Sequence, residues 1–389
     1  MAYIEFYDVV GKMEQRVKNI LLIIPNLDFG GAQRSFAKLH AALEKKHRVL
    51  PVVFNTDTGV AYPMSGELIS LEIRGGGNWI KKVINFFKRV SKLKKIKRER
   101  KINISISFLE GADFINILSK RSEKIIVSIR GSKLSDETIQ GKIGWVRKKI
   151  LIPFLYRRAD HITAVNSGII QELNDHFGLG AIKKSLIYNS YDIASIEKQA
   201  HEALPAELNF LSDKPYILFS GRLAVEKGID KLISVYSRLT TRAGFRFVII
   251  GSGPMHNDLL NLCRKLDLKV YTPERDDLAL SSKSEVVFLG QQSNPHKFVG
   301  KAEAFLMASS SEGFPNALAE AMICGAPVLS SDCPWGPREI LSEHYVPKEN
   351  LSSAEYADFG ILLPVFSKKK EGGLDTSIQV WTETLDKFL

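Results

Sequence analysis

Two carboxylates stand eight residues apart in the stretch SEGFPNALAEAM, with a turn and a predicted helix start between them. Glu312 precedes the turn Gly313–Pro315, and Glu320 lies inside the helix that follows. Proline suits the first helical turn because it has no N–H group to leave unpaired. The amides of a helix start and the positive end of its dipole form a ready site for a pyrophosphate.

We therefore predict that the backbone N–H groups from Phe314 to Leu318 hold a diphosphate. Glu320 could accept hydrogen bonds from both hydroxyls of a ribose, and Glu312 would point at the group attached to the far phosphate. The alternative is that both acids are ordinary surface residues. The Gly-Phe-Pro-Asn insert is difficult to explain as mere surface, so the stretch predicts a nucleotide-sugar site.

Two cations occur in the stretch SGRLAVEKGIDKLI, between a predicted strand and a predicted helix. Arg222 offers a planar fork and Lys227 a point charge, and both groups suit a diphosphate. The alternative is a pair of solvated surface cations. Their position directly after the strand end favours the functional interpretation.

Glycines follow two other predicted strands. Gly30 and Gly31 come just after NILLII, where the absence of side chains would let the backbone approach a phosphate, or would simply allow a tight turn. The stretch GSGP, residues 251–254, resembles a dinucleotide loop superficially. It lacks the third glycine of that motif and a ribose-binding acid about twenty residues further on.

The elements that position these residues alternate between short apolar runs and longer helical patterns. Such alternation predicts parallel sheets with helices on both faces. The first series of strands is NILLIIP, HRVLPVVF, INISISFL, KIIVSI and HITAVN, and the second is YILFSGR, FRFVIIG, VVFLG, AFLMAS and APVLSS. We therefore predict two Rossmann-like doubly wound domains, residues 1–200 and 201–389. Ligands bind beyond the carboxyl ends of such strands, so the site is expected in a cleft between the domains.

The composition of 44% hydrophobic and 25% charged residues is that of a globular protein. The three cysteines form no CxxC pair, which predicts a reducing, cytoplasmic compartment. We find neither a bilayer-spanning apolar run nor a signal-peptide pattern. Because no zinc-type spacing and no D-x-D motif occurs, we expect no metal ion and no cofactor.

One basic segment carries almost all of the net charge of +11. Residues 81–101 hold eleven Lys or Arg and one acid. Its apolar residues recur at helical spacing: Ile80, Val83, Ile84, Phe87 and Val90. This pattern predicts a basic amphipathic helix on an anionic membrane surface, or alternatively a domain helix with its apolar stripe in the core. Nucleic acid is not expected as a partner, since no aromatic and basic platform accompanies the charge.

The stretches GRLAVEKGID, GSGP, VVFLGQ and SEGFPNALAEAMICGAPVLSSD together resemble the donor-binding half of retaining glycosyltransferases of family 4 (glycosyl transferases group 1), whose fold is GT-B. E-x7-E with an inserted Gly-Phe-Pro is among the most specific marks of that family. GGAQR and CPWGPREIL fit the same group, and the resemblance spans about residues 18–365.

The resemblance implies roles for the residues singled out above. Arg222 and Lys227 would hold the donor diphosphate, Glu320 the ribose and Glu312 the transferred sugar. Gly30 and Gly31 would approach the diphosphate from the first domain. The expected donor-binding residues are Gly30, Gly31, Arg222, Lys227, Leu289 of the FLGQ segment beside the base, Glu312, Gly313, Phe314, Pro315, Asn316, Ala317, Leu318 and Glu320.

Many family members place a histidine near the sugar at the end of a first-domain strand. This chain has VSIRGSK there, so Arg130 is expected to contact donor or acceptor. The catalytic residues implied are Glu312, Arg222, Lys227 and Arg130. In such enzymes the departing diphosphate oxygen takes the proton of the acceptor on the same face, and protein cations replace a metal. A final helix within DTSIQVWTETLDKFL is expected to cross back to the first domain.

The resemblance thus implies a retaining, metal-independent transferase. It would move a hexose or N-acetylhexosamine, with N-acetylgalactosamine as the best match, from a UDP-sugar to a polyprenyl-diphosphate-linked glycan. The expected setting is bacterial O-antigen or capsule synthesis, peripheral on the inner face of the cell membrane. A GT-B nucleotide-sugar epimerase and a non-catalytic nucleotide-sugar-binding module are the alternatives.

Overall fold

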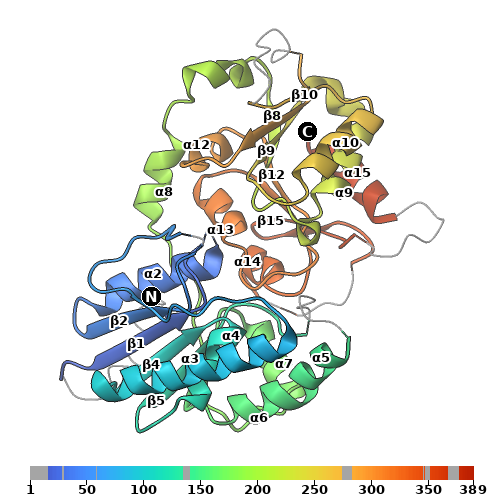
Figure 1. Cartoon of the computed structure of the whole chain (residues 1–389). Coiled ribbons are helices and arrows are strands. Elements are labelled where there is room, and N and C mark those ends of the chain that lie inside the picture. The colour runs from blue at the N-terminus through green and yellow to red at the C-terminus, as the bar shows by residue number, and fades with distance from the viewer. Residues whose placement is uncertain are drawn as a thin grey trace. The chain divides into compact units, whose positions relative to one another are not determined.

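The computed structural model describes residues 16–28, 30–57, 59–134, 141–273, 283–344, 346, 351–366 and 376–389. The chain divides into two compact units, Met1–Ser190 and Tyr191–Leu389, where the sequence predicted domains of 1–200 and 201–389. Each unit is built on its own sheet flanked by helices, drawn in Figure 1 from blue to green and from green to red. The prediction of two doubly wound α/β units is confirmed.

The first unit contains a seven-stranded parallel sheet in the order β3-β2-β1-β4-β5-β6-β7. Its central strands are buried on both faces, as their continuous apolar runs predicted. The strands are β1 (Asn19–Ile24), β2 (Arg48–Val53), β3 (Ile69–Ser70), β4 (Ile104–Phe108), β5 (Lys124–Ile129), β6 (His161–Ala164) and β7 (Lys184–Leu186).

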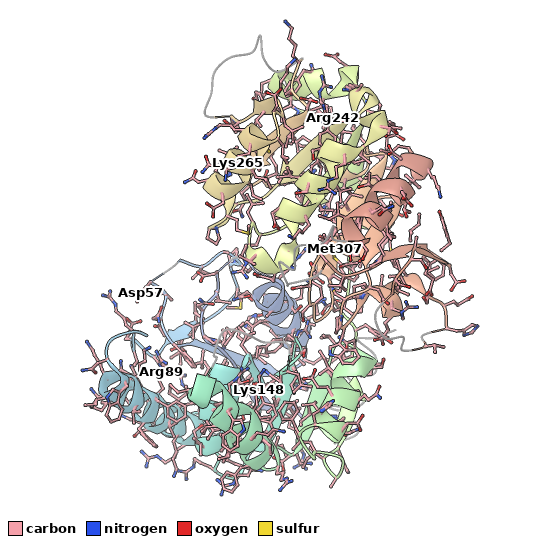
Figure 2. All side chains as sticks on the ribbon, turned by 90° about the vertical axis from the view of Figure 1, so that its right-hand side faces the viewer. Asp57, Arg89, Lys148, Arg242, Lys265 and Met307 are labelled. Carbon is pink, nitrogen blue, oxygen red and sulfur yellow. The ribbon has the colours of Figure 1, made fainter. Side chains whose placement is uncertain are left out.

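Helices connect these strands in chain order: α2 (Gly31–Leu43), α3 (Trp79–Glu99), α4 (Glu110–Leu118), α5 (Gly141–Val146), the π-helical turn η1 (Arg147–Leu151), α6 (Ile152–Tyr156) and α7 (Ser167–Asp175). Helix α3 packs on α4, and α4 in turn packs on α6. In α3 the guanidinium of Arg89, labelled in Figure 2, lies 4.3 Å from the ring centroid of Phe54, and its Nη2 donates to the carbonyl of Ile73.

The second unit contains an eight-stranded sheet in the order β10-β11-β9-β8-β12-β13-β15-β14. All neighbouring strands run parallel except the last pair, β14 and β15. The strands are β8 (Tyr216–Ser220), β9 (Arg246–Ile250), β10 (Val270–Tyr271), β11 (Val286–Gly290), β12 (Ala304–Met307), β13 (Val328–Ser331), β14 (Glu355–Ala357) and β15 (Gly360–Leu363).

The helices of this unit are α8 (Ile193–Ala200), α9 (Ile229–Arg238), α10 (His256–Lys265), α12 (His296–Val299), α13 (Asn316–Ile323), α14 (Pro337–Leu341) and α15 (Thr376–Phe388). Short 3-10 turns complete it: η2 (Ala206–Asp213), η3 (Val225–Lys227) and η4 (Thr240–Gly244).

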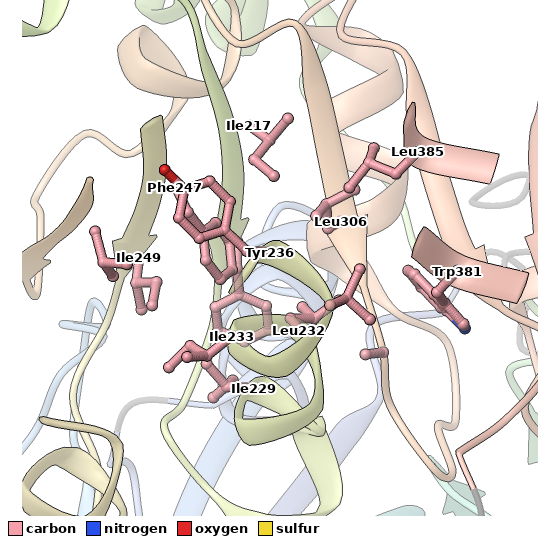
Figure 3. Close-up of a cluster of buried hydrophobic side chains, with 14 of the residues drawn as sticks. Ile217, Ile229, Leu232, Ile233, Tyr236, Phe247, Ile249, Leu306, Trp381 and Leu385 are labelled. Atoms are coloured by element: carbon pink, nitrogen blue, oxygen red, sulfur yellow. The ribbon is translucent and has the colours of Figure 1, made fainter. Parts of the chain in front are cut away.

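The final helix, α15, belongs to the core of the second unit, whereas the family resemblance implied that it would cross back to the first. Figure 3 shows Trp381 and Leu385 of α15 beside Leu232 of α9 and Leu306 of β12. The indole N–H of Trp381 donates to the carbonyl of Pro364 at 2.8 Å. The apolar face of α15 therefore covers the sheet of its own unit, because burying that face offers more apolar area than an exposed crossing.

Each sheet has a central switch point, from which the chain continues to strands on opposite sides. In the first unit it lies between β1 and β4, and in the second between β8 and β12. Loops that leave the carboxyl ends of two such strands diverge, so this is where open α/β sheets bind ligands. Among the helices that the structure describes, none is long and apolar enough to cross a membrane.

Candidate active site

The loops after β8 and β12 meet at the switch point of the second sheet. The amide of Ser310 donates to the carbonyl of Glu226 at 2.8 Å, which joins the two loops directly. Gly228 has the left-handed φ of 64°, and a Cβ there would lie 2.4 Å from the carbonyl oxygen of Ala308. A glycine is required at this position for both backbone conformation and space.

This packing brings together two residues that are 85 positions apart in the chain. Lys227 Nζ lies 2.5 Å from Glu312 Oε1, and the Ser309 hydroxyl donates to the same carboxylate oxygen at 2.6 Å. The side chains of Lys227 and Glu312 are 24% and 12% exposed. Burial lowers the pKa of Lys227, but the charge and hydrogen bond of Glu312 more than offset it, so the pKa lies above its ordinary value.

Arg222 lies in the same loop but is largely exposed, and it pairs with Glu226 one helical turn on. The loop that carries it is fixed by the GSGP stretch. A Cβ on Gly251 would lie 1.9 Å from the carbonyl of Gly221, and one on Gly253 would lie 2.4 Å from that of Leu223. These glycines therefore let the loop after β9 pack against the loop of Arg222, a structural role that the sequence motif did not reveal.

The loop after β13 supports Glu312 from the other side. The amide of Glu312 donates to the carbonyl of Pro334 at 2.9 Å. Arg338 holds this loop, since its buried guanidinium forms ion pairs with Asp332 at 2.6 Å and Glu355 at 2.7 Å. The CPWGPREIL stretch thus helps to position the Glu312 carboxylate.

Helix α13 begins at Asn316, with Pro315 at the cap position. The amides of Leu318 and Ala319 donate to the carbonyl of Pro315, so the predicted role of the Leu318 amide in holding phosphate is not supported by this geometry. The hydroxyl of Tyr191 donates to Asn316 Oδ1 at 2.7 Å. The predicted phosphate contacts of this turn are therefore restricted to residues before Leu318, including Gly313 and Phe314.

Glu320 lies in the second turn of α13 and is only 12% exposed. Its Oε2 lies 3.3 Å from Nε2 of His296, whose Nδ1 lies 2.8 Å from Gln199 Oε1. The Glu320 carboxylate accepts this hydrogen bond when His296 carries a proton on Nε2. His296, the first residue of α12, was not predicted from the sequence, since the residues around it carry no motif.

Leu289 lies at the end of β11 with its side chain buried in the core. Only the main chain of this residue can reach a ligand, and its carbonyl accepts a hydrogen bond from Gln292 Nε2 at 2.7 Å. The predicted contact with a base must therefore come from backbone atoms or from neighbouring residues of the loop.

In the first unit, Arg130 follows β5 at the carboxyl edge of the sheet. Its Nη2 donates to Ser35 Oγ of α2 at 2.6 Å and to Asn189 Oδ1, and its guanidinium lies 5.6 Å from the ring centroid of Phe108. Gly30 and Gly31 form the turn into α2, the helix that carries Ser35. Gly30 has extended backbone (φ 177°), which any residue adopts, and a Cβ there would meet only the end of the flexible Gln33 side chain.

Among the residues that the structure describes, no cluster of three or more His, Cys, Asp or Glu could hold a metal ion. In the second unit, Arg222, Lys227, Glu312 and the start of α13 thus belong to loops that leave the carboxyl ends of strands at the switch point. This is where doubly wound sheets bind ligands.

Comparison with known proteins identifies the family to which the chain belongs. The model of the glycosyl transferases group 1 matches residues 201–358, and that of glycosyltransferase family 4 matches residues 29–195. The chain belongs to this glycosyltransferase family and has its GT-B fold.

Relatives and solved structures extend the likeness over most of the chain. One relative, N-acetylgalactosamine-N,N'-diacetylbacillosaminyl-diphospho-undecaprenol 4-alpha-N-acetylgalactosaminyltransferase of Campylobacter jejuni, is 29% identical, with 83% of each chain covered. The GalNAc-alpha-(1->4)-GalNAc-alpha-(1->3)-diNAcBac-PP-undecaprenol alpha-1,4-N-acetyl-D-galactosaminyltransferase of the same species is 24% identical, covering 84% of this chain and 82% of its own.

Among solved structures, the lipopolysaccharide outer core galactosyltransferase WaaB has a TM-score of 0.64 at 20% identity, with 96% of this chain and 90% of that chain covered. Anabaena HepE in complex with UDP and glucose has a TM-score of 0.63 at 15% identity, with 95% and 89% covered. At these identities the likeness establishes the fold.

Proposed function

We propose that this glycosyltransferase moves a sugar from a UDP-sugar to a polyprenyl-diphosphate-linked glycan, with retention of configuration and without a metal ion. The observation that carries the proposal is the convergence of Lys227 and Glu312 at the switch point of the second sheet, 2.5 Å apart. Lys227 and Arg222 would neutralise the departing diphosphate, which is the task a divalent ion performs elsewhere.

Glu312, paired with Lys227, would contact the sugar. Glu320, held by His296, would accept the ribose hydroxyls, and the turn at Gly313 and Phe314 would meet the pyrophosphate. In the first unit, Arg130 and the Gly30–Gly31 turn would contact the donor or the acceptor, because they lie at the carboxyl edge of that sheet. A leaving-group oxygen that takes the proton of the acceptor needs no separate base.

N-acetylgalactosamine is the favoured sugar, and an undecaprenyl-diphosphate-linked glycan the favoured acceptor. Both Campylobacter relatives carry these groups in their names, and both names state an alpha product. The lipopolysaccharide galactosyltransferase of Salmonella typhimurium, 30% identical over 47% of this chain, places another relative in surface-polysaccharide synthesis. We propose the same setting here, with the protein acting peripherally on the inner face of the membrane.

Helix α3 supports a membrane role through its first half. Five of its large apolar side chains are exposed, among them Trp79 (73%) and Phe87 (60%); the others are Ile80, Val83 and Ile84. The second half of α3 matches the alternative prediction, a domain helix with its apolar stripe in the core, since Leu93 and Lys97 are buried. Lys97 bonds to Glu123 at 2.8 Å, so it is not one of the cations available to a lipid surface.

A panel of UDP-sugars tests the proposal, read first as thermal shift and then as transfer to an undecaprenyl-diphosphate-linked disaccharide. UDP-N-acetylgalactosamine should give both binding and product. Release of an epimerised sugar without acceptor would replace transfer by epimerisation. Binding of UDP without product from any lipid-linked acceptor would favour a non-catalytic module.

A further inference from the structure

A second apolar surface of the first unit lies on the short helices after β5. Within α5, η1 and α6, six large apolar side chains are exposed, which we call the 143–154 patch: Ile143, Trp145, Val146, Ile150, Leu151 and Phe154. Ile143 is 74% exposed, Trp145 60% and Phe154 57%. Single exposed apolar residues are common on proteins, but six within twelve positions mark an interaction site.

The patch faces outward because the opposite side of the same segment is firmly held. The guanidinium of Arg147 donates to both carboxylate oxygens of Glu110, at the start of α4. The hydroxyl of Tyr156 donates to Asp113 of α4 at 2.8 Å, and Tyr156 is completely buried. Figure 1 shows α5 and α6 in the first unit with α4, on which α6 packs. The exposure is therefore a property of a fixed helical segment.

The positive charge around the 143–154 patch indicates which kind of partner it binds. Residues 141–158 hold six Lys or Arg and no acid. Lys149, Arg157 and Arg158 are exposed, and the guanidinium of Arg158 lies 4.8 Å from the ring centroid of Phe154. A second copy of the chain would bring like charges together on this surface, which opposes association. Aromatic and aliphatic side chains ringed by cations match the boundary between anionic headgroups and acyl chains.

We propose that the 143–154 patch inserts into the headgroup region of an anionic bilayer, as a lipid contact additional to the exposed half of α3. This inference rests on the proposed function in one respect, since it explains how a lipid-linked acceptor reaches the first unit. Arg147 ties the inserted segment to Glu110, directly after β4. That residue lies at the carboxyl edge of the sheet where Arg130 follows β5, so the lipid contact is coupled to the edge assigned to substrates.

Co-sedimentation of the full chain with vesicles of equal parts phosphatidylcholine and phosphatidylglycerol tests this inference. The variant Trp145→Gln/Phe154→Gln should lose about ten- to a hundredfold in vesicle partition, because two aromatic side chains no longer leave water. Val225→Gln, which alters an exposed apolar residue of the second unit, is the matched control and should bind as the wild type does. Trp79→Gln measures the contribution of α3 separately.

Tryptophan fluorescence provides an independent readout. Brominated phosphatidylglycerol should quench emission of the wild type, and Trp145→Phe should remove part of that quenching. Full vesicle binding by the Trp145→Gln/Phe154→Gln variant would overturn the inference. So would a wild-type dimer that this variant dissociates without any vesicle binding, since a second copy would then cover the patch. UDP affinity and transfer to a short-chain, water-soluble acceptor should remain unchanged in the variant. A wild-type protein that neither binds UDP nor transfers sugar to this acceptor would instead refute the proposed function.

Discussion

The ion pair between Lys227 and Glu312 provides a quantitative test of the active-site geometry. We consider Lys227→Met, Glu312→Gln and the double variant. Each single change leaves one charged or polar group in a mostly buried place without its partner, whereas the double change removes both. Glutamine keeps an acceptor for the Ser309 hydroxyl, so Glu312→Gln isolates the loss of the charge.

The structure sets the size of the effect. Nζ and Oε1 are 2.5 Å apart, and the side chains are 24% and 12% exposed. Breaking a fully buried pair costs about 3–5 kcal/mol, and the residual exposure places each single variant near about 2–3 kcal/mol in free energy of unfolding. The double variant should lose less than the sum of the two, with a coupling energy of about 1.5–3 kcal/mol.

Urea unfolding of the full chain, followed by tryptophan fluorescence, measures these values, because the buried Trp381 reports on the second unit. The folded pKa of Lys227 is raised, so its stabilisation is complete below the unfolded pKa and is lost only as the pH rises through the folded value. The coupling should therefore be constant between about pH 6 and pH 9. Losses that add within about 0.5 kcal/mol would refute a direct Lys227–Glu312 contact.

Four further outcomes are expected. His296→Ala should weaken UDP binding while reducing the preference for UDP over 2′-deoxy-UDP by roughly tenfold, since Glu320, the carboxylate proposed to bind the ribose, loses its partner; an unchanged preference would show that His296 does not orient Glu320. Burial, with a smaller contribution from Glu110, raises the pKa of Asp113 to about 6. Between about pH 4 and pH 6 the carboxyl is ionised in the unfolded chain but still protonated in the folded chain, so the wild type loses stability as the pH rises. Over that range the unfolding free energy of Asp113→Asn should gain about 2–3 kcal/mol relative to wild type, and a difference independent of pH would contradict this. Neutralising three of the exposed cations in the second half of α3, Lys94, Lys95 and Arg98, should reduce binding to anionic vesicles, whereas Lys97→Met should chiefly lower stability; equal vesicle binding by the triple variant would restrict any lipid contact of α3 to its first half. Transfer should continue in excess chelator, and an absolute requirement for Mn²⁺ or Mg²⁺ would exclude the metal-free mechanism.

The strands of both sheets could be predicted because buried parallel strands are continuous apolar runs. All ten predicted strands are present, and the edge strands β3, β7, β10 and β14 were missed, together with β15. Two of the missed strands, β3 and β10, contain only two residues each, too few to give a pattern. The packing of α15 against the second unit could not be predicted from the resemblance, because it depends on which apolar surface the buried Trp381 covers.

The candidate site, too, could be predicted from the sequence only in part. Arg222, Lys227 and Glu312 lie in loops directly after strands, so their common edge follows from topology alone. The direct Lys227–Glu312 contact depends on Gly228 packing against Ala308, which is a tertiary feature with no local signature. His296 and the 143–154 patch were missed for a similar reason, since burial or exposure of an apolar helix face is decided by its neighbours in space.

The measurement that tests the central claim most directly is transfer from UDP-N-acetylgalactosamine to an undecaprenyl-diphosphate-linked glycan, with the anomeric configuration of the new bond read by NMR. We predict an alpha-linked product from the alpha-configured donor, and its loss in Glu320→Ala together with UDP affinity. A beta-linked product, or no product with any UDP-sugar while UDP remains bound, would contradict the account.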